Sequence, residues 1–209
     1  MYLRNALAVG PRLYLRPGDP DDATAFSRFT AIDPDPNWDR LRVPSSRMGF
    51  RHYITKTFED ATPGSLLYTV CLKDGDAPIG DVGLHDIDWV NRTAETSAWI
   101  GDPAYRDSGY GTEAKFLLLE IAFDLLQLHV LMSWIWEPNK RSAAAVTGQG
   151  YQPAGRMPYD EVRGGAMHDG VVFDILRDEY LAARAVWEQR VAARTAEAAA
   201  PGAVSQHNA

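Results

Sequence analysis

Cysteine is nearly absent from this chain of 209 residues, since Cys71 is the only one. A single thiol excludes an intramolecular disulfide framework and a zinc site built from several cysteines. Cys71 lies within the apolar run SLLYTVCL, so we expect a small buried side chain rather than a nucleophile. No clustering of other ligand types suggests a metal site.

Long apolar runs and an excess of basic residues are also missing. No stretch approaches the roughly 18 apolar residues that span a bilayer, and the apolar core of MYLRNALAVGPRL is too short for a signal peptide. We therefore expect a cytoplasmic protein that is not bound to a membrane. With 21 Lys and Arg against 28 Asp and Glu, the net charge of -7 argues against nucleic-acid binding. It suits either a cationic amine as partner or ordinary solubility.

What remains is the composition of a globular protein, with 45% hydrophobic residues. We expect one mixed α/β domain over residues 1–180 and a tail over 181–209 that begins as a helix and ends disordered. Proline and glycine divide the domain into alternating elements. The first part is expected to hold a strand at 13–16, a helix capped by Asp21 or Asp22, a proline-broken loop at 31–50 and a helix at 51–61. Three antiparallel strands should follow between 65 and 103. The rest should be a helix at 111–126, a strand at 129–136, a helix after Asn139, and two strands around a loop at 163–170.

The predicted helix 111–126 is apolar around most of its circumference. Its polar residues are Glu113, Lys115, Glu120, Asp124 and Gln127, and all but Lys115 fall on one narrow stripe at helical spacing. We therefore expect this helix to lie on a sheet with that stripe exposed.

The segment RDSGYG, residues 106–111, places an arginine and two glycines before this helix. Unpaired backbone amides at a helix start, together with the helix dipole and a fixed positive charge, suit a diphosphate. A dinucleotide fingerprint is a second interpretation, but eight residues separate Ile100 from Gly109, whereas that motif follows its strand directly. A turn that binds no ligand is the third.

Other motifs follow in order along the chain. AETSAWIGDPAYR precedes the glycine segment, NKRSAAAVTGQGY follows it, and the pair His168-Asp169 comes before the last strand. With this order and spacing, residues 10–180 resemble the GCN5-related N-acetyltransferase (GNAT) superfamily, in particular its RimJ/RimL-like branch. The signature Q/R-x-x-G-x-G/A of that family is matched by Arg106, Gly109 and Gly111.

The resemblance implies a GNAT fold, with a mostly antiparallel sheet of about seven strands that splays between strands 95–101 and 130–136. It also implies direct transfer of an acetyl group from acetyl-CoA to a primary amine, without a covalent intermediate. The motif would hold the diphosphate, the preceding strand would bind the pantetheine arm and stabilise an oxyanion, and the helix start near 139 would add contacts. The implied cofactor-binding residues are Trp99, Ile100, Gly101, Arg106, Asp107, Ser108, Gly109, Tyr110, Gly111, Thr112, Asn139 and Ser142.

Acetyl transfer to an amine needs a base and a proton for the departing thiolate. Glu95 occupies the strand position that supplies the base in related enzymes, and His85 and Asp86 are alternatives. Many relatives use a tyrosine seven positions after the asparagine as the acid, but Val146 stands there. Ser142 is our candidate to protonate or hydrogen-bond the thiolate. His168-Asp169 is expected to be a structural pair.

The acceptor site is expected near residues 30–60 and the strand at His85. Trp38, His85 and Asp86 are predicted to contact the acceptor, which would be a protein N-terminus, a polyamine, or an amine metabolite or antibiotic. Residues that line or attract it could include Asp33, Asp35, Asp39, Arg42, Arg47 and Tyr53. A non-catalytic CoA-binding module on the same fold is the alternative, because of Val146. A homodimer is possible through the helix of the tail.

Overall fold

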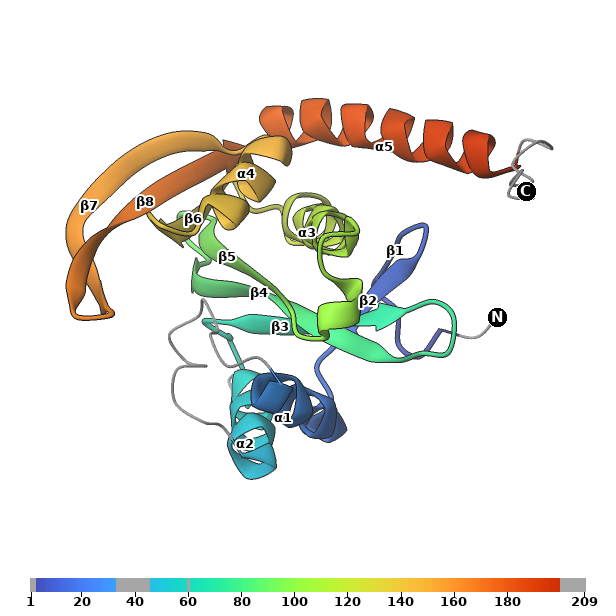
Figure 1. Cartoon of the computed structure of the whole chain (residues 1–209), viewed down its shortest axis with the longest axis horizontal. Coiled ribbons are helices and arrows are strands. Elements are labelled where there is room, and N and C mark those ends of the chain that lie inside the picture. Colours follow the sequence, from blue (N-terminus) through green and yellow to red (C-terminus); the bar gives the residue numbers. More distant parts are fainter. Residues whose placement is uncertain (1–2, 33–45, 60, 200–209) are drawn as a thin grey trace, which may run out of the picture.

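The computed structural model describes residues 3–32, 46–59 and 61–199. One sheet of eight strands runs through the molecule in the order β1-β2-β3-β4-β5-β6-β8-β7 (Figure 1). All neighbours are antiparallel except β5 and β6, which are parallel. The strands are β1 (Ala8–Val9), β2 (Leu13–Pro17), β3 (Leu66–Leu72), β4 (Pro78–Asp88), β5 (Thr93–Ile100), β6 (Val130–Trp136), β7 (Gln152–Arg163) and β8 (Ala166–Leu176).

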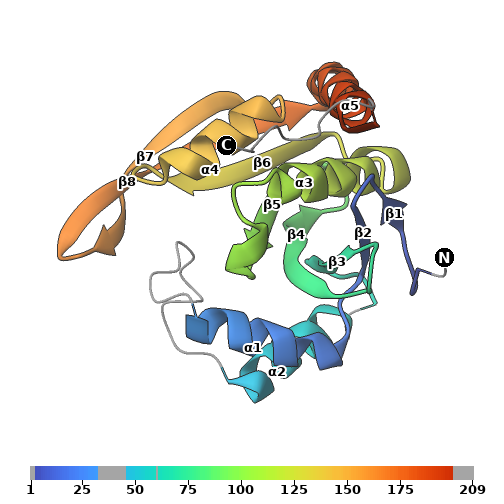
Figure 2. The same ribbon diagram turned by 45° about the vertical axis from the view of Figure 1, so that its right-hand side comes forward.

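Helices cover both faces of this sheet. In Figures 1 and 2, α1 and α2 lie on one face and α3, α4 and α5 on the other. They are α1 (Ala23–Ile32), α2 (Arg47–Thr57), α3 (Tyr110–Glu120), α4 (Lys140–Gly148) and α5 (Arg177–Ala199), with the 3₁₀ turns η1 (Pro20–Asp22) and η3 (Pro103–Tyr105) and the π-helical turn η4 (Ile121–Leu125). The mixed α/β fold is therefore confirmed, with one strand more than the seven expected. No described helix combines the length and apolar character needed to cross a membrane.

Alternation along the strands sends side chains to two separate cores. On β5, Ala94 and Ile100 join the large core beneath α3, whereas Trp99 packs on the smaller core of α1 and α2. The rings of Phe26 and Phe29 meet Trp99 edge to face, at centroid distances of 5.8 and 6.1 Å. Because side chains alternate with a period of two, Glu95 and Ser97 share the face of Trp99.

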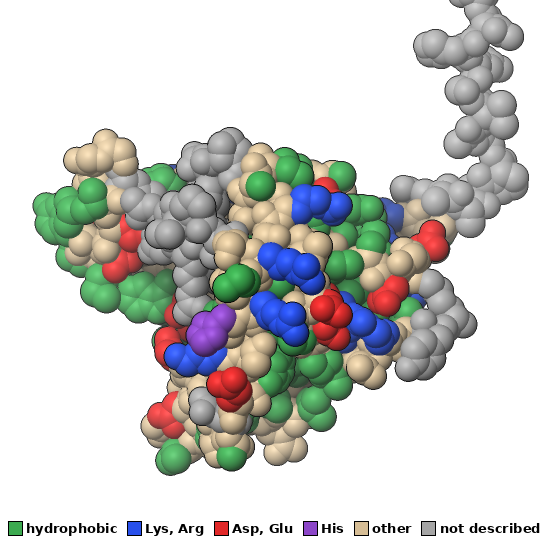
Figure 3. Space-filling model, turned by 90° about the horizontal axis from the view of Figure 1, so that it is seen from below, with side chains coloured by type: hydrophobic (Ala, Val, Ile, Leu, Met, Phe, Trp, Pro, Cys, Tyr) green, Lys and Arg blue, Asp and Glu red, His purple; other side chains and the backbone are tan. Residues whose placement is uncertain are grey.

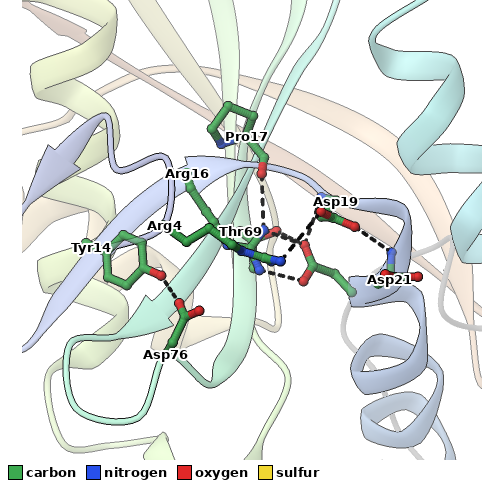
Figure 4. Close-up of polar contacts among 9 residues, drawn as sticks. Arg4, Tyr14, Arg16, Pro17, Asp19, Asp21, Thr69 and Asp76 are labelled. Carbon is green, nitrogen blue, oxygen red and sulfur yellow. Dashed lines mark hydrogen bonds and ion pairs between the residues drawn. The ribbon is translucent and has the colours of Figure 1, made fainter. Parts of the chain in front are cut away.

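A buried ion pair ties η1 to the sheet on the α1–α2 side. Arg16 donates to the two carboxylate oxygens of Asp22 at 2.8 and 2.7 Å, and the Thr69 hydroxyl donates to the same carboxylate at 2.6 Å. Figure 4 shows Arg16 and Thr69 converging there. The predicted helix cap was wrong: Asp19 caps η1, while Asp22 is its capping-box partner and lies inside the protein.

The predicted exposed stripe of the central helix was wrong at its first position. Glu113 is buried, because α3 packs against β1 and β2 as well as against the middle of the sheet. Lys115 is also buried. The helical path continues as predicted to Leu125, but its last turn is π-helical.

The C-terminal region differs from expectation in two places. The predicted loop at 163–170 is largely strand, because β7 and β8 form a long hairpin around a tight turn at Gly164-Gly165, both with positive φ. Arg177 begins a helix rather than continuing the strand. That helix, α5, stacks Trp187 on Phe116 and Tyr180 on Phe123, at centroid distances of 4.9 and 5.3 Å, so its first half belongs to the packed body.

Candidate active site

The two parallel strands in the middle of the sheet separate after three residue pairs. Thr93, Ala94 and Glu95 pair with residues 130–132, and the pairing of β5 with β6 ends there. Beyond this point a side chain replaces the backbone pairing, since the Thr96 hydroxyl donates a hydrogen bond to the Met132 carbonyl at 2.9 Å. We call the divergence of β5 and β6 beyond Glu95 and Met132 the fork. Strand edges that face each other unpaired can hydrogen-bond an extended ligand.

The helix that starts beside the fork has no side-chain cap from the part of the chain that the structure describes. Gly109, the N-cap of α3, is in the left-handed region at φ 81°. The Glu113 amide bonds the Gly109 carbonyl at 3.1 Å, so the amides of residues 110–112 precede the first intrahelical bond. Exposed amides at a helix N-terminus bind anions such as phosphates. The backbone at the start of α3 is therefore suited to bind a diphosphate, as the first interpretation of the glycine segment requires.

Arg106 is placed differently from the expected phosphate ligand. Its guanidinium donates to the carbonyls of Ile100 and Gly101 at 2.8 and 2.9 Å, and its amide donates to the Pro103 carbonyl. The side chain therefore anchors the glycine segment to the end of β5. The Gly101 amide is also used, since it donates to Ile79 at 2.9 Å.

Arg12 is a second cation at the glycine segment, and no local pattern predicted its place there. It donates to the Ser108 carbonyl at 3.0 Å, and its guanidinium lies 4.0 Å from the centroid of the Tyr110 ring. The Glu113 carboxylate holds it in place through Arg12 Nε at 2.8 Å. Arg12 directly precedes β2 and lies 96 residues before Ser108, so only the folded chain brings it here.

The start of α4 lies on the same side of the sheet as α3. Asn139 is the N-cap of α4, and its side-chain oxygen accepts from the Ser142 amide at 3.1 Å, as predicted. Ser142 is half-buried, and within the described residues its hydroxyl forms no hydrogen bond. Arg141 and Asp107 form an exposed ion pair at 3.6 Å, which links α4 to the glycine segment. The predicted cofactor residues of both segments thus lie around one end of the fork.

Glu95 lies at the apex of the fork, on the face that carries α1 and α2. Burial raises the pKa of its carboxyl group, the negative charge of Asp86 adds to the increase, and hydrogen bonding by the Trp134 backbone opposes it. A carboxylate with a raised pKa is a better proton acceptor than an ordinary surface carboxylate. His85 is paired with Glu95 across β4 and β5 and lies 2.8 Å from the Ser97 hydroxyl through Nε2.

The other predicted residues lie further away or cannot be placed. Asp86 is exposed, with a positive φ at an irregularity of β4. Residues Asp33, Asp35, Trp38, Asp39 and Arg42 lie outside the described residues. Asp169 accepts from the Tyr159 amide at 3.0 Å and pairs with Arg156, while His168 packs on Trp136. The two residues therefore contact different partners, and their structural role stays a prediction.

A buried lysine at the fork went unrecognised as a site residue. Lys115 is only 3% exposed, and its Nζ lies 5.5 Å from the ring centroid of buried Tyr151. The Tyr151 hydroxyl lies 2.7 Å from the Thr96 hydroxyl at the fork apex. Burial lowers the pKa of Lys115 to about 7, and the charge of Glu95 opposes that decrease. The helical pattern concealed it, because a lysine in a helix is usually solvated.

The described side chains on the face that carries α1 and α2 are of both charges. In Figure 3, which views the molecule from this side, basic and acidic side chains are mixed. Among the described residues, no three His, Cys, Asp or Glu side chains are arranged to hold a metal ion.

Comparison with known proteins agrees with this geometry. Residues 12–152 match the family model described as an acetyltransferase (GNAT) domain. A solved GNAT-family acetyltransferase from Chromobacterium violaceum is 28% identical and superposes with a TM-score of 0.71, covering 86% of this chain and 90% of its own. A chimera of the Vibrio cholerae spermidine N-acetyltransferase is 20% identical, with a TM-score of 0.71 and coverage of 81% and 98%. A Vibrio cholerae protein described as a ribosomal-protein-serine acetyltransferase is 22% identical, with a TM-score of 0.67 and coverage of 84% and 99%.

Proposed function

The chain belongs to the GNAT family, and we propose that its acceptor is a primary amine bound on the Glu95 side of the fork. As a member of this family it is an N-acetyltransferase that uses acetyl-CoA as co-substrate. Among the acceptors of that class are a protein N-terminus, a polyamine and an amine metabolite or antibiotic. We also assign it to the RimJ/RimL-like branch on the motifs of residues 94–106 and 139–151.

The observation that carries this proposal is the uncapped start of α3 beside the fork. A diphosphate fits exposed amides at a helix N-terminus, and an amide-bearing chain fits the unpaired edge of β5. The amides of residues 107–112 and Arg12 would hold the diphosphate. Backbone groups of β5 near Trp99 would hold the pantetheine arm. Because Arg106 already binds the Ile100 and Gly101 carbonyls, its part is to shape this site.

Acetyl-CoA supplies a thioester, an activated acyl group that a neutral amine can attack. The chain must then accept a proton from the amine and support the sulfur that leaves. Glu95 is our base, since its raised pKa and its position at the apex suit proton transfer. Ser142 lies at the start of α4, its hydroxyl has no partner among the described residues, and it would hydrogen-bond the sulfur. His85 and Asp86 would contact the acceptor from β4.

The proposal is tested first by calorimetric titration of the protein with acetyl-CoA. Gly109→Val should abolish binding, because a β-branched residue is strained at φ 81° and the amides would move. Gly75→Val is a matched control: its φ is 83°, and a Cβ there meets nothing within 4 Å. It should lose similar stability and keep its affinity. Failure of the wild type to bind acetyl-CoA would contradict the proposed site.

The acceptor class is tested by CoA release. Acetyl-CoA and the protein would be incubated with a panel of polyamines, peptides with free N-termini and aminoglycosides, and free thiol would be measured. One class should raise the release well above the rate without acceptor. Acetyl-CoA binding without release by any amine would instead support a non-catalytic CoA-binding module.

A further inference from the structure

Lys115 is a buried cation that the mechanism above does not use. It lies on α3, is 3% exposed, and forms no hydrogen bond or ion pair with any described residue. A buried ammonium normally has a partner, because leaving it unpaired in an apolar region is costly. A lysine retained in such a position therefore points to a group that is absent from the chain itself.

The surroundings of Lys115 direct it to the fork. Its aromatic neighbour is Tyr151, whose hydroxyl meets Thr96 just beyond the last pair of β5 and β6. The charged group whose field reaches it is Glu95, at the same apex. Lys115 and Glu95 thus approach the apex from opposite faces of the sheet, one from α3 and one from β5.

The remaining charges near α3 are already engaged. Glu113 is bound by Arg12, the residue before β2, whose Nε lies 2.8 Å from the Glu113 carboxylate. Glu120 pairs with Arg184 of α5 at 2.9 Å. Asp124, in the turn that follows α3, pairs with Arg177 at 2.7 Å. Among the described residues, the titratable groups that act on or contact Lys115 are Glu95 and Tyr151.

The fork also lacks an obvious proton donor for the CoA thiolate among the side chains of α4, and a lysine can supply that proton. Val146 is buried on α4, and its carbonyl accepts from the Tyr151 amide at 3.1 Å, so α4 offers an apolar side chain beside Tyr151. The Ser142 hydroxyl can hydrogen-bond a thiolate, but a serine is too weak an acid to be the net source of its proton. A buried ammonium with a pKa of about 7 is a suitable source at neutral pH.

We propose that Lys115 donates the proton taken up by the CoA thiolate when the acetyl group leaves it, a role that rests on the proposed function. The C–N bond to the neutral amine forms and the C–S bond breaks. Lys115 Nζ gives a proton to the sulfur and becomes a neutral amine, while Glu95 takes a proton from the acceptor nitrogen. Transfer of that proton from Glu95 to Lys115 restores both groups, so no other reactant is needed.

The test compares Lys115→Met, Lys115→Arg and the wild type, with Arg190→Met, an exposed cation of α5, as control. The primary readout is the thiol pKa of bound CoA, followed by the ultraviolet absorbance of the thiolate during a pH titration. An ammonium nearby should lower that pKa by about one unit or more relative to free CoA. Lys115→Met should remove this decrease and reduce kcat by about 10- to 100-fold, with acetyl-CoA affinity retained. Arg190→Met should match the wild type.

Lys115→Arg separates charge from proton donation, because a guanidinium does not give up its proton near neutral pH. It should keep the thiol pKa low and still lose turnover. A second readout concerns folding: a lysine with a lowered pKa makes the wild type more stable as the pH rises from about 7 towards its unfolded value, and Lys115→Met should lack that rise.

Two results would overturn the role of Lys115. Unchanged thiol titration and unchanged kcat in a folded Lys115→Met protein would make the lysine merely structural. Full turnover in Lys115→Arg would make it an electrostatic group and not the acid. Failure of wild-type protein to bind CoA or acetyl-CoA would instead contradict the proposed function, and Lys115 would then have no thiolate to protonate. If Lys115→Met does not fold, Lys115→Gln provides the same comparison.

Discussion

Glu113 joins Arg12 across the interface between the central helix and the sheet. Its carboxylate accepts from the backbone amide of Arg12 at 2.7 Å and from Arg12 Nε at 2.8 Å, and the Leu13 amide adds a third bond at 2.9 Å. The same Arg12 reaches the Ser108 carbonyl, so this buried acid fixes the glycine segment to the start of β2.

Glu113→Ala should destabilise the protein by about 3 kcal/mol, because it leaves buried amides without acceptors. Arg12→Met should cost only about 1 kcal/mol, since both backbone amides keep their bonds. Both variants should also bind acetyl-CoA more weakly. Urea unfolding and calorimetry measure these effects. Glu137→Ala, which breaks the exposed pair with Lys140, is the control and should change stability by less than about 1 kcal/mol. Equal effects of Glu113→Ala and Glu137→Ala would contradict this account.

Asp22→Ala should destabilise the protein by about 3–5 kcal/mol, because it leaves the Arg16 guanidinium buried without its partner. Replacing both residues, Arg16→Met with Asp22→Leu, should recover most of that loss. Unfolding free energies of the single and double variants measure the coupling. A double variant no more stable than Asp22→Ala would show that the pair does not act as a unit.

The same pair predicts a dependence of stability on acid. Burial alone would raise the pKa of Asp22, but hydrogen bonds from Arg16 and Thr69 outweigh burial and lower it. Since the folded pKa lies below the unfolded value, this stabilisation is complete above about pH 4 and is lost as the pH falls through the folded pKa. Asp22→Asn should therefore lose less stability than the wild type in that range. Parallel acid titrations of both proteins would disprove the assignment.

Glu95→Gln should lower kcat by about 10-fold or more and leave acetyl-CoA affinity unchanged. The wild-type rate should rise as the pH increases through the raised pKa of Glu95, and the variant should lose that rise. Because the folded carboxyl binds its proton more tightly than the unfolded one, the charged form destabilises the fold. Glu95→Gln should therefore be slightly more stable than the wild type at pH 7. Wild-type turnover in this variant would transfer the role of base to another group, such as His85.

Ser142→Ala should lower kcat by about 10-fold, the value of one hydrogen bond to a charged group in the transition state. Stability should hardly change, since the hydroxyl has no partner among the described residues. Thr147→Val on the same helix is the control: it breaks a bond to the Ala143 carbonyl at 2.9 Å and should leave kcat unchanged. Equal turnover in both variants would remove Ser142 from the mechanism.

Local pattern was enough to predict several features of this protein. The alternation of TAETSAWI predicts β5, and the asparagine at 139 predicts the start of α4 with its cap. The paired glycines before an apolar run predict an uncapped helix start. Each of these depends on residues within a few positions of one another, so the sequence contains the whole interaction.

Contacts between distant segments could not be predicted in the same way. Periodicity placed Glu113 on a solvated stripe, but β1 and β2 pack over that side of α3 and bury it. The short loop expected at 163–170 became a hairpin because the two strands pair with each other over most of their length. Arg12 and Lys115 went unrecognised because the residues that surround them in the fold lie far away in the chain.

By itself, the sequence determined the elements, the glycine-rich helix start and the family, since backbone preferences and motif spacing act locally. Only the tertiary structure decided the electrostatics of the site. It buried Lys115 beside Tyr151, raised the pKa of Glu95 and turned Arg106 back towards β5. The reason is that desolvation and charge depend on which groups surround a side chain in space, and that is settled only when distant strands and helices pack together.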